Sequence, residues 1–218
     1  MAKVFIVGAA GKVGTRLTRL LATDGHIVHA LHRKPEQADT LAAAGATPVL
    51  GDLTALSDEA LAALMAGSDA VVFAAGAGGA GIAVTNAIDG RGLERSVAAA
   101  QAAGIARFLL VSVFPDALRD GDRSAGFENY ARVKKLADAH LVASDLDWVI
   151  VRPGTLSDDP GTGHVHADAA IPYGDVTRDD VAATLAGILD RPGISRTIIE
   201  LTGGATPIGA ALDRLAAR

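Results

Sequence analysis

The chain has 218 residues, of which 50% are hydrophobic and 21% charged, and its formal net charge at pH 7 is −5. This length suits one domain spanning residues 1–218, and the acidic balance argues against a nucleic-acid partner, which requires a basic face. The absence of cysteine excludes disulfides and thiolate chemistry, and no apolar run reaches the roughly 18 residues of a membrane span, so we expect a cytoplasmic protein that binds no membrane.

The first predicted element is a buried strand that turns directly into a helix over about 12–23. Val4-Phe5-Ile6-Val7 is an apolar run typical of a parallel strand covered on both faces. Gly8, Gly11 and Gly14 follow at three-residue intervals, which suits a tight turn, close approach of the backbone to a diphosphate, and close packing of helix on strand. The free N–H groups at the start of the helix would bind that diphosphate. The predicted cofactor contacts in this loop are Gly8, Ala10, Gly11, Lys12, Val13 and Gly14.

Two other interpretations of this glycine loop were weighed against the residues. A Walker phosphate loop needs glycine at position 6 and serine or threonine at position 13, where the chain has Ile6 and Val13. A glycine-rich turn without a ligand is the second alternative. The position of the loop, after a buried strand and before an amphipathic helix, favours a dinucleotide site.

The second predicted strand, Ile27–His32, is followed by two basic residues, Arg33 and Lys34. At this position NAD-binding sites carry an acidic residue that binds the ribose 2′-hydroxyl. Two cations in its place favour a 2′-phosphate, which they can bind by charge-assisted hydrogen bonds. The sequence therefore predicts NADP(H) in preference to NAD(H), with an ordinary solvated strand end as the alternative.

The third and fourth predicted strands, Thr47–Leu53 and Asp69–Ala74, add contacts to the same site. Asp52, with Leu53, ends the third strand, where it is either a partner for the adenine amino group or the cap of a turn. The fourth strand continues into a tail of alanines and glycines that begins at Ala74, Ala75 and Gly76. Such a tail suits a backbone lying against a cofactor, or else a flexible loop.

Strands and helices continue to alternate through a helix over about 85–103 and a strand over 107–112, which ends at Val111 and Ser112. This alternation predicts an α/β fold of the Rossmann type, a doubly wound parallel sheet of about seven strands with helices on both faces. Ligands of such sheets bind beyond the carboxyl ends of the strands. We therefore expect Gly8, Ala75 and Ser112 to meet at one edge.

A polar loop over 115–126 leads to a helix that contains Tyr130 and Lys134, the candidate catalytic pair. Residues four apart share one face of a helix, so both side chains can reach one ligand. A nearby ammonium favours the phenolate, so we expect Lys134 to lower the pKa of Tyr130 from about 10 toward the working range. An amphipathic helix with a solvated lysine is the alternative. Ser112 could help to hold a carbonyl oxygen.

Three motifs in this order resemble the short-chain dehydrogenase/reductase superfamily. They are Gly8-Ala9-Ala10-Gly11-Lys12-Val13-Gly14, Tyr130-Ala131-Arg132-Val133-Lys134 and Leu146-Asp147-Trp148-Val149-Ile150-Val151-Arg152-Pro153-Gly154. The resemblance extends over essentially the whole chain and is nearest to the atypical, NmrA-like NAD(P)H-binding branch, close to the biliverdin-IXβ/flavin reductases.

This resemblance implies a role for each candidate residue. Tyr130 would be the proton donor, Lys134 the ribose anchor that tunes it, and Ser112 the hydroxyl that orients a carbonyl. Pro153, with Gly154, would line the nicotinamide side. Related sequences often end the fifth strand in paired serines or Ser-Thr, whereas this chain continues from Ser112 into valine and phenylalanine.

The region after Pro153 is predicted to supply the substrate-side loops, residues 153–218. A loop over 157–172 would form the substrate wall. His164 and His166 within it could be a metal pair, but no third ligand is evident, so we expect no metal site. A helix over 177–189 begins with a capping pattern of Thr177 and Asp180, and a seventh strand over 197–202 and a helix over 207–217 follow.

The sequence favours an NADPH-dependent oxidoreductase that reduces a small carbonyl, quinone or flavin. The first alternative is an NADP(H)-binding redox sensor without turnover. A weaker one is a nucleotide-sugar epimerase or dehydratase, for which the short segment after Pro153 leaves little room. The expected partner is a small-molecule substrate, and the oligomeric state, monomer or dimer, stays open.

Overall fold

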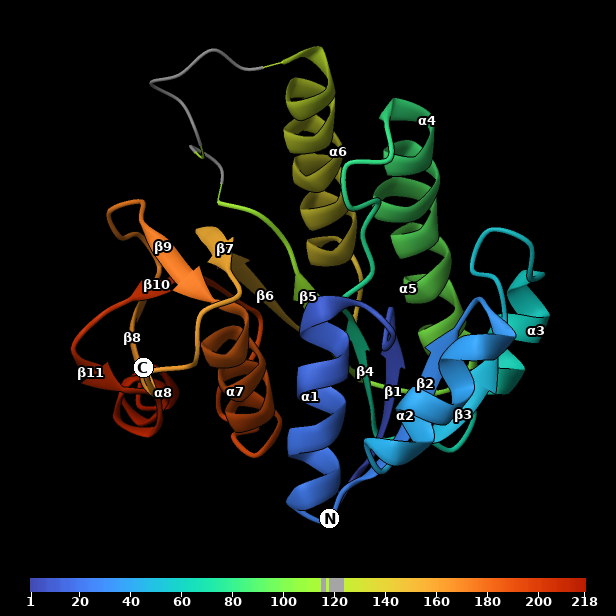
Figure 1. Ribbon diagram of the computed structural model, residues 1–218, viewed down its shortest axis with the longest axis horizontal. Coiled ribbons are helices and arrows are strands. Elements are labelled where there is room, and N and C mark those ends of the chain that lie inside the picture. The colour runs from blue at the N-terminus through green and yellow to red at the C-terminus, as the bar shows by residue number, and fades with distance from the viewer. Residues whose placement is uncertain (115–116, 118–123) are drawn as a thin grey trace.

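The computed structural model describes residues 1–114, 117 and 124–218, so most of the loop predicted over 115–126 lies outside the described residues. Its centre is a nine-stranded sheet with helices on both faces (Figure 1). In spatial order the strands are β11 (Thr206–Pro207), β8 (His164–Asp168), β10 (Thr197–Gly203), β6 (Asp147–Pro153), β5 (Arg107–Val111), β4 (Ala70–Phe73), β1 (Lys3–Val7), β2 (Ile27–His32) and β3 (Thr47–Leu50).

The strands from β10 to β3 are all parallel to their neighbours, which confirms the predicted doubly wound sheet. The prediction of about seven strands was too low, because β8 and β11 extend the sheet beyond β10 by antiparallel pairing. Strand β8 lies inside the segment that we expected to be a loop over 157–172. Two further strands, β7 (Thr155–Ser157) and β9 (Asp175–Thr177), pair with each other in a separate small sheet.

The helices follow the predicted order. They are α1 (Lys12–Thr23), α2 (Ala38–Ala43), α3 (Asp58–Met65), α4 (Ile82–Thr85), α5 (Leu93–Ala102), α6 (Ala125–Val142), α7 (Arg178–Leu189) and α8 (Ile208–Ala216). A 3₁₀ turn, Pro35–Gln37, precedes α2, and the helix expected over 85–103 is divided by a π-helical segment, Asn86–Gly92. None of the helices in the described part of the chain has the length and apolar character that would carry it across a bilayer.

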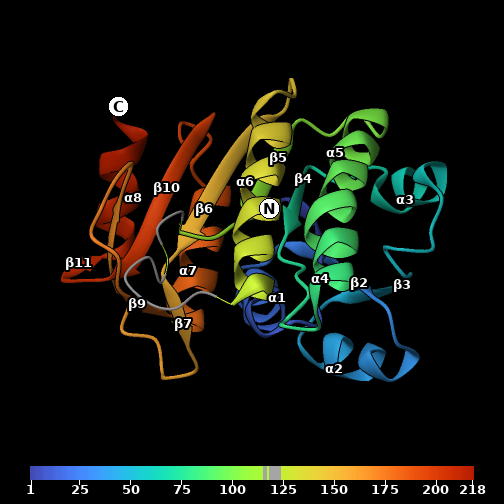
Figure 2. The ribbon, with the colours of Figure 1, turned by 90° about the horizontal axis from the view of Figure 1, so that it is seen from above.

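Alternate side chains of each strand enter two separate cores, one on either face of the sheet. In β1, Val4 and Ile6 belong to the core that contains residues of α1 and α7, whereas Phe5 and Val7 belong to the core formed with α3, α5 and α6. This follows from the two-residue period of a strand. Seen from above, α5 and α6 cover one face and α1 and α7 lie beyond the sheet (Figure 2). Both faces are therefore filled, and only the strand ends are left to form a site.

Close packing of α1 on β1 depends on two of the three glycines in the loop. Gly8 has φ +87°, a left-handed conformation that favours glycine. A Cβ added at Gly14 would collide with the carbonyl oxygen of Gly8. The loop therefore brings the start of α1 directly over the end of the central strand.

Candidate functional site

The carboxyl ends of β1, β2, β4 and β5 border one cleft of about 970 Å³. Its volume lies within the range of small-molecule sites. Fifteen of the predicted residues line it, so the structure brings the dinucleotide loop and the candidate catalytic pair together. They are Gly8, Ala10, Gly11, Lys12, Val13, Arg33, Asp52, Leu53, Ala74, Ala75, Gly76, Val111, Ser112, Tyr130 and Lys134.

Three predicted cofactor contacts, Gly14, Lys34 and Pro153, do not line this cleft. Gly14 lies beneath the loop, where it serves the packing of α1. Lys34 is exposed, and its ammonium lies 3.9 Å from the carboxylate of Glu36. Pro153 is buried at the end of β6 beside Leu201 of β10, so it belongs to the sheet rather than to the cleft wall.

The start of α1 has the features of an anion site. Gly11 is its N-cap and provides no side-chain cap, and the first turn of the helix contains no acidic residue. The N–H groups of that turn are therefore left for a ligand. The floor beside them is backbone alone, because a Cβ at Gly8 would lie 2.5 Å from the Cα of Ala75. A diphosphate fits the space between these N–H groups and the backbone of Gly8 and Ala75, which we call the cradle.

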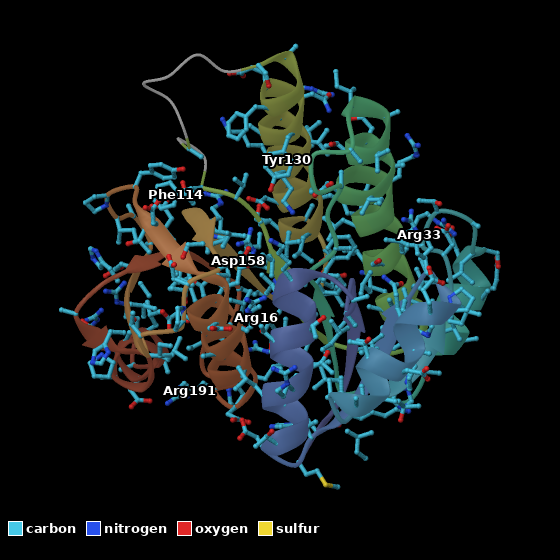
Figure 3. The ribbon with its side chains drawn as sticks, in the orientation of Figure 1. Arg16, Arg33, Phe114, Tyr130, Asp158 and Arg191 are labelled. Atoms are coloured by element: carbon cyan, nitrogen blue, oxygen red, sulfur yellow. The ribbon has the colours of Figure 1, made fainter. Side chains whose placement is uncertain are left out.

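Asp158, in the loop after β7, binds three cations at the edge of this cradle. Its carboxylate lies 2.5 Å from Lys12 Nζ, 3.0 Å from Arg178 Nη1 and 3.5 Å from Arg16 Nη2. The hydrogen bond from Lys12 and the nearby positive charges hold the pKa of Asp158 below its usual value. Figure 3 shows Asp158 beside Arg16 at the start of α1. Arg178 also lines the cleft, a contact that the sequence analysis did not anticipate.

Arg33 and Asp52, which follow β2 and β3, line the same cleft. Figure 3 shows Arg33 well apart from Tyr130. Arg33 is exposed, so its guanidinium is available to an anion. Asp52 Oδ1 accepts hydrogen bonds from Thr54 N, at 2.8 Å, and Thr54 Oγ1, at 2.7 Å. These bonds hold the pKa of Asp52 below its usual value. Asp52 thus caps a turn, as one alternative predicted. It also lines the cleft, and its contact with the adenine amino group stays a prediction.

Helix α6 places Tyr130, Lys134 and Asp138 on one face at intervals of four residues. Lys134 is 2% exposed, and its ammonium donates a hydrogen bond of 2.7 Å to the carbonyl of Val111 at the end of β5. The carboxylate of Asp89, in the π-helical segment, lies 3.6 Å from the same ammonium. Burial lowers the pKa of Lys134, and the two nearby carboxylates oppose that shift.

Ser112 does not direct its hydroxyl hydrogen into the cleft. Its Oγ donates a hydrogen bond of 2.6 Å to Asp138 Oδ1, and Arg152 Nε donates to Asp138 Oδ2 at 2.9 Å. Burial raises the pKa of Asp138 even though these partners favour the carboxylate. The oxygen of Ser112 can accept a hydrogen bond from a ligand, but orienting a carbonyl requires a donor.

The expectation that Lys134 lowers the pKa of Tyr130 was wrong. Burial raises the pKa of Tyr130 far above its ordinary value, and the carboxylates of Asp89 and Asp138 raise it further. The reason is geometric, because the Lys134 ammonium faces the Val111 carbonyl and the Asp89 carboxylate. At neutral pH Tyr130 is therefore a phenol, which can donate a proton.

Two charged residues beside the candidate catalytic pair, Asp89 and Asp138, were not predicted from the sequence. Asp138 could have been found, because it continues the four-residue spacing of Tyr130 and Lys134 along one helix. Asp89 gave no such signal, since its contact with Lys134 depends on the π-helical segment. His164 and His166 are exposed on β8, and among residues 1–114, 117 and 124–218 no three metal-ligating side chains gather into a cluster.

The fold and the cleft define a nucleotide-binding α/β protein, and comparison with known proteins identifies its class. The sequence pattern of the NAD(P)H-binding family matches residues 8–192, so the chain belongs to that family. This confirms the resemblance to the atypical, NmrA-like short-chain dehydrogenases/reductases. Membership of the family also supports a nicotinamide nucleotide as the cofactor.

Particular relatives cover nearly the whole chain. A Bacillus subtilis (strain 168) protein named "Uncharacterized sugar epimerase YhfK" is 41% identical over 98% of this chain and 100% of its own. A Bacillus halodurans structure named for the NAD-dependent epimerases/dehydratases superposes with a TM-score of 0.90 at 34% identity, covering 99% of this chain and 100% of its own. ChuY, an anaerobillin reductase from Escherichia coli O157:H7, has a TM-score of 0.79 at 26% identity, covering 92% of this chain and 97% of its own.

Proposed function

We propose that the protein is an NADPH-dependent oxidoreductase that transfers hydride to a small carbonyl, quinone or flavin, with Tyr130 as the proton donor. The observation that carries this proposal is that Tyr130, held as a neutral phenol, lines the same cleft as the diphosphate cradle of the glycine loop. A group that donates a proton must itself be protonated at the working pH. The reductase activity of ChuY, a relative with the same fold, supports this class of reaction.

Bound NADPH supplies the hydride, and the residues of the chain position the reactants and supply the proton. The amides of Gly11 to Val13 and the start of α1 would hold the diphosphate, with Arg33 on the 2′-phosphate. Lys134 would anchor the adjoining ribose. Tyr130 would then protonate the substrate oxygen that becomes negatively charged as hydride arrives. This mechanism assigns the whole chain, residues 1–218, to one domain, in which 153–218 supplies Leu156 and Arg178 to the cleft.

The preference for NADP(H) rests on Arg33. Its exposed guanidinium lines the cleft beyond β2, where NAD-specific sites carry an acidic residue. Arginine binds phosphate through two parallel hydrogen bonds. Lys34 does not line the cleft and is left out of this proposal.

The substitution Tyr130→Phe tests the proton-donor role. We expect turnover of NADPH with a panel of quinones, flavins and aldehydes to fall by about 10²–10⁴-fold, the usual contribution of a general acid, while NADPH still binds. Tyr173→Phe is the matched control, because Tyr173 contacts Phe114 and Thr155 outside the cleft. Unchanged turnover in Tyr130→Phe would indicate that the substrate takes its proton from water. Binding without any turnover by the wild type would favour the redox sensor.

The names of two relatives favour a second candidate, a nucleotide-sugar epimerase or dehydratase. Such a reaction begins with removal of a proton, which would require Tyr130 as a phenolate. The high pKa of the buried phenol opposes that role. Turnover of a nucleotide-sugar panel with bound NAD⁺, absent from Tyr130→Phe, would support this candidate over the reductase.

A further inference from the structure

Asp89 is a buried carboxylate beside the cleft for which the proposed mechanism has no role. It is 1% exposed and lies in the π-helical segment between α4 and α5. Its Oδ2 accepts a hydrogen bond of 2.9 Å from the amide of Ala77, whereas its Oδ1 is buried without a hydrogen-bond partner. A buried carboxylate is costly unless a charge or hydrogen bonds compensate it. The nearest cation to Oδ1 is the Lys134 ammonium, at 3.6 Å.

Three separate segments meet where Asp89 contacts Lys134. Lys134 comes from α6 and Asp89 from the π-helical segment, while the tail of β4 passes over the carboxylate. A Cβ at Gly76 in that tail would lie 3.2 Å from Asp89 Oδ1, so a glycine there leaves room for the carboxylate. The contact therefore links the tail that borders the cofactor cleft to the helix that carries Tyr130.

The charges around Tyr130 form two neutral pairs. Lys134 lies against Asp89, and Arg152 of β6 is bonded to Asp138 of α6. A lone ammonium would favour the phenolate, but an ammonium compensated by a carboxylate gives little net attraction. Burial is the main cause that raises the pKa of Tyr130, and the two carboxylates, which offset the attraction of the ammonium, raise it further.

The other charged groups on the packed elements face elsewhere. Helix α4 contains none, Glu94 of α5 is exposed, and Arg95 is bonded to Asp58 and to backbone carbonyls. Arg91 of the π-helical segment and Arg132 of α6 are exposed. Of the two carboxylates that act on Lys134, Asp138 is paired with Arg152, so Asp89 is the one that forms an ion pair with Lys134 among the described residues of these elements.

From this arrangement we propose that Asp89 is a positioning residue that pairs with Lys134, compensates its positive charge and thereby favours the phenol form of Tyr130 over the phenolate. The proposal deepens the proposed reductase function and rests on it for its catalytic meaning. In this proposal the π-helical segment places Asp89 beside Lys134, in keeping with the frequent occurrence of such segments at functional sites.

The test uses the small number of tyrosines in this chain. There are two, so Tyr173→Phe leaves Tyr130 as the single tyrosine, and its ionisation can be followed by phenolate absorbance without any turnover. In this background we expect Tyr130 to titrate above 10, the ordinary value. A titration below that value would overturn the proposal without a further variant.

Asp89→Asn, made in the same background, removes the charge and keeps the shape. We expect the Tyr130 titration to fall by about one pH unit or more, because Lys134 then acts on the phenol uncompensated. Asp89→Glu, which restores the charge, should return the titration toward its starting value. Asp89→Ser serves if Asp89→Asn does not fold, and Asp58→Asn is the control for loss of a surface carboxylate. An unchanged or higher titration in the neutral variants would overturn the proposal.

Steady-state kinetics give a second measurement. In Asp89→Asn the basic limb of kcat for NADPH-dependent reduction should move to lower pH by the same amount, with KM for NADPH changed less than kcat. A merely structural role would lower activity evenly across the pH range. If Tyr130 ionises at lower pH in Asp89→Asn while Tyr130→Phe retains full turnover, the proposed proton donor fails and the electrostatic role of Asp89 remains.

Discussion

Lys12, in the glycine loop, donates a hydrogen bond of 2.5 Å to Asp158, a residue 146 positions further along the chain. Arg178 and Arg16 contact the same carboxylate. An internal anion therefore engages the cations beside the cradle in which the diphosphate of a nicotinamide cofactor would lie. Asp158 and the cofactor would compete for these cations.

Substitution of Asp158 by asparagine should therefore strengthen cofactor binding. Exposed ion pairs contribute about 0.2–1 kcal/mol, so release of Lys12 and Arg178 should lower the Kd for NADPH by up to about fivefold. Titration calorimetry at low and high salt measures this, and the difference should shrink at high salt because the charges are screened. Asp159→Asn, which removes the same charge at the next position, is the control. Weaker binding in Asp158→Asn would mean that the ion pairs instead shape the site.

Replacement of Arg33 by glutamine should weaken binding of NADPH but not of NADH. Hydrogen bonds to charged groups contribute about 1.5–3 kcal/mol, so we expect the Kd for NADPH to rise by about tenfold or more. Lys34→Gln removes the neighbouring cation, which does not line the cleft, and should change neither Kd. Equal losses for both nucleotides, or a larger effect from Lys34→Gln, would show that the 2′-phosphate is bound elsewhere.

Asp180 should make the free energy of unfolding depend on pH in the acidic range. It is 2% exposed and accepts hydrogen bonds from the amides of Thr162 and Gly163 and the hydroxyl of Thr177. Burial raises the pKa of Asp180, but these bonds together outweigh it and lower the pKa below the usual value. The stabilisation is thus present above about pH 4, the unfolded value, and is lost as pH falls through the lower folded value.

Asp180→Asn should be about 1–3 kcal/mol less stable than the wild type at pH 7, the cost of unsatisfied buried groups. This difference in the free energy of unfolding should narrow as pH falls below about 4, because the Asp180 carboxylate of the wild type is then protonated and loses its charge. Thermal unfolding followed by circular dichroism between pH 2.5 and 7 gives both curves, with Asp39→Asn on exposed α2 as the control. A gap that stays constant over this range would contradict the assignment.

Local sequence signals predicted the elements that border the proposed diphosphate site. The glycine spacing and the apolar run before it predicted β1 and the bounds of α1, Lys12–Thr23, because the turn needs glycine at particular positions. Alternating strands and helices predicted the parallel part of the sheet. Strand β8 was missed although its residues alternate, with Val165 and Ala167 buried and the histidines exposed. The polar residues in this segment favoured a loop instead.

Contacts between distant segments could not be derived from spacing alone. Nothing near Asp89 indicates a lysine, since the partner lies on α6 and the approach depends on a π-helical segment. Lys34 and Pro153 show the converse, because a suitable residue type at the expected position along the chain can still lie outside the cleft wall. The Tyr130 expectation failed for the same reason, since spacing places Lys134 near the phenol but says nothing of the carboxylates that compensate it.

Each outermost strand of the sheet contains a proline, Pro48 in β3 and Pro207 in β11. Proline has no amide hydrogen to offer to an approaching strand, and β11 is only two residues long. Open edges otherwise act as templates on which further molecules add strands and aggregate. The prolines thus protect both borders of the sheet against fibril-like growth, a safeguard separate from anything that happens in the cleft.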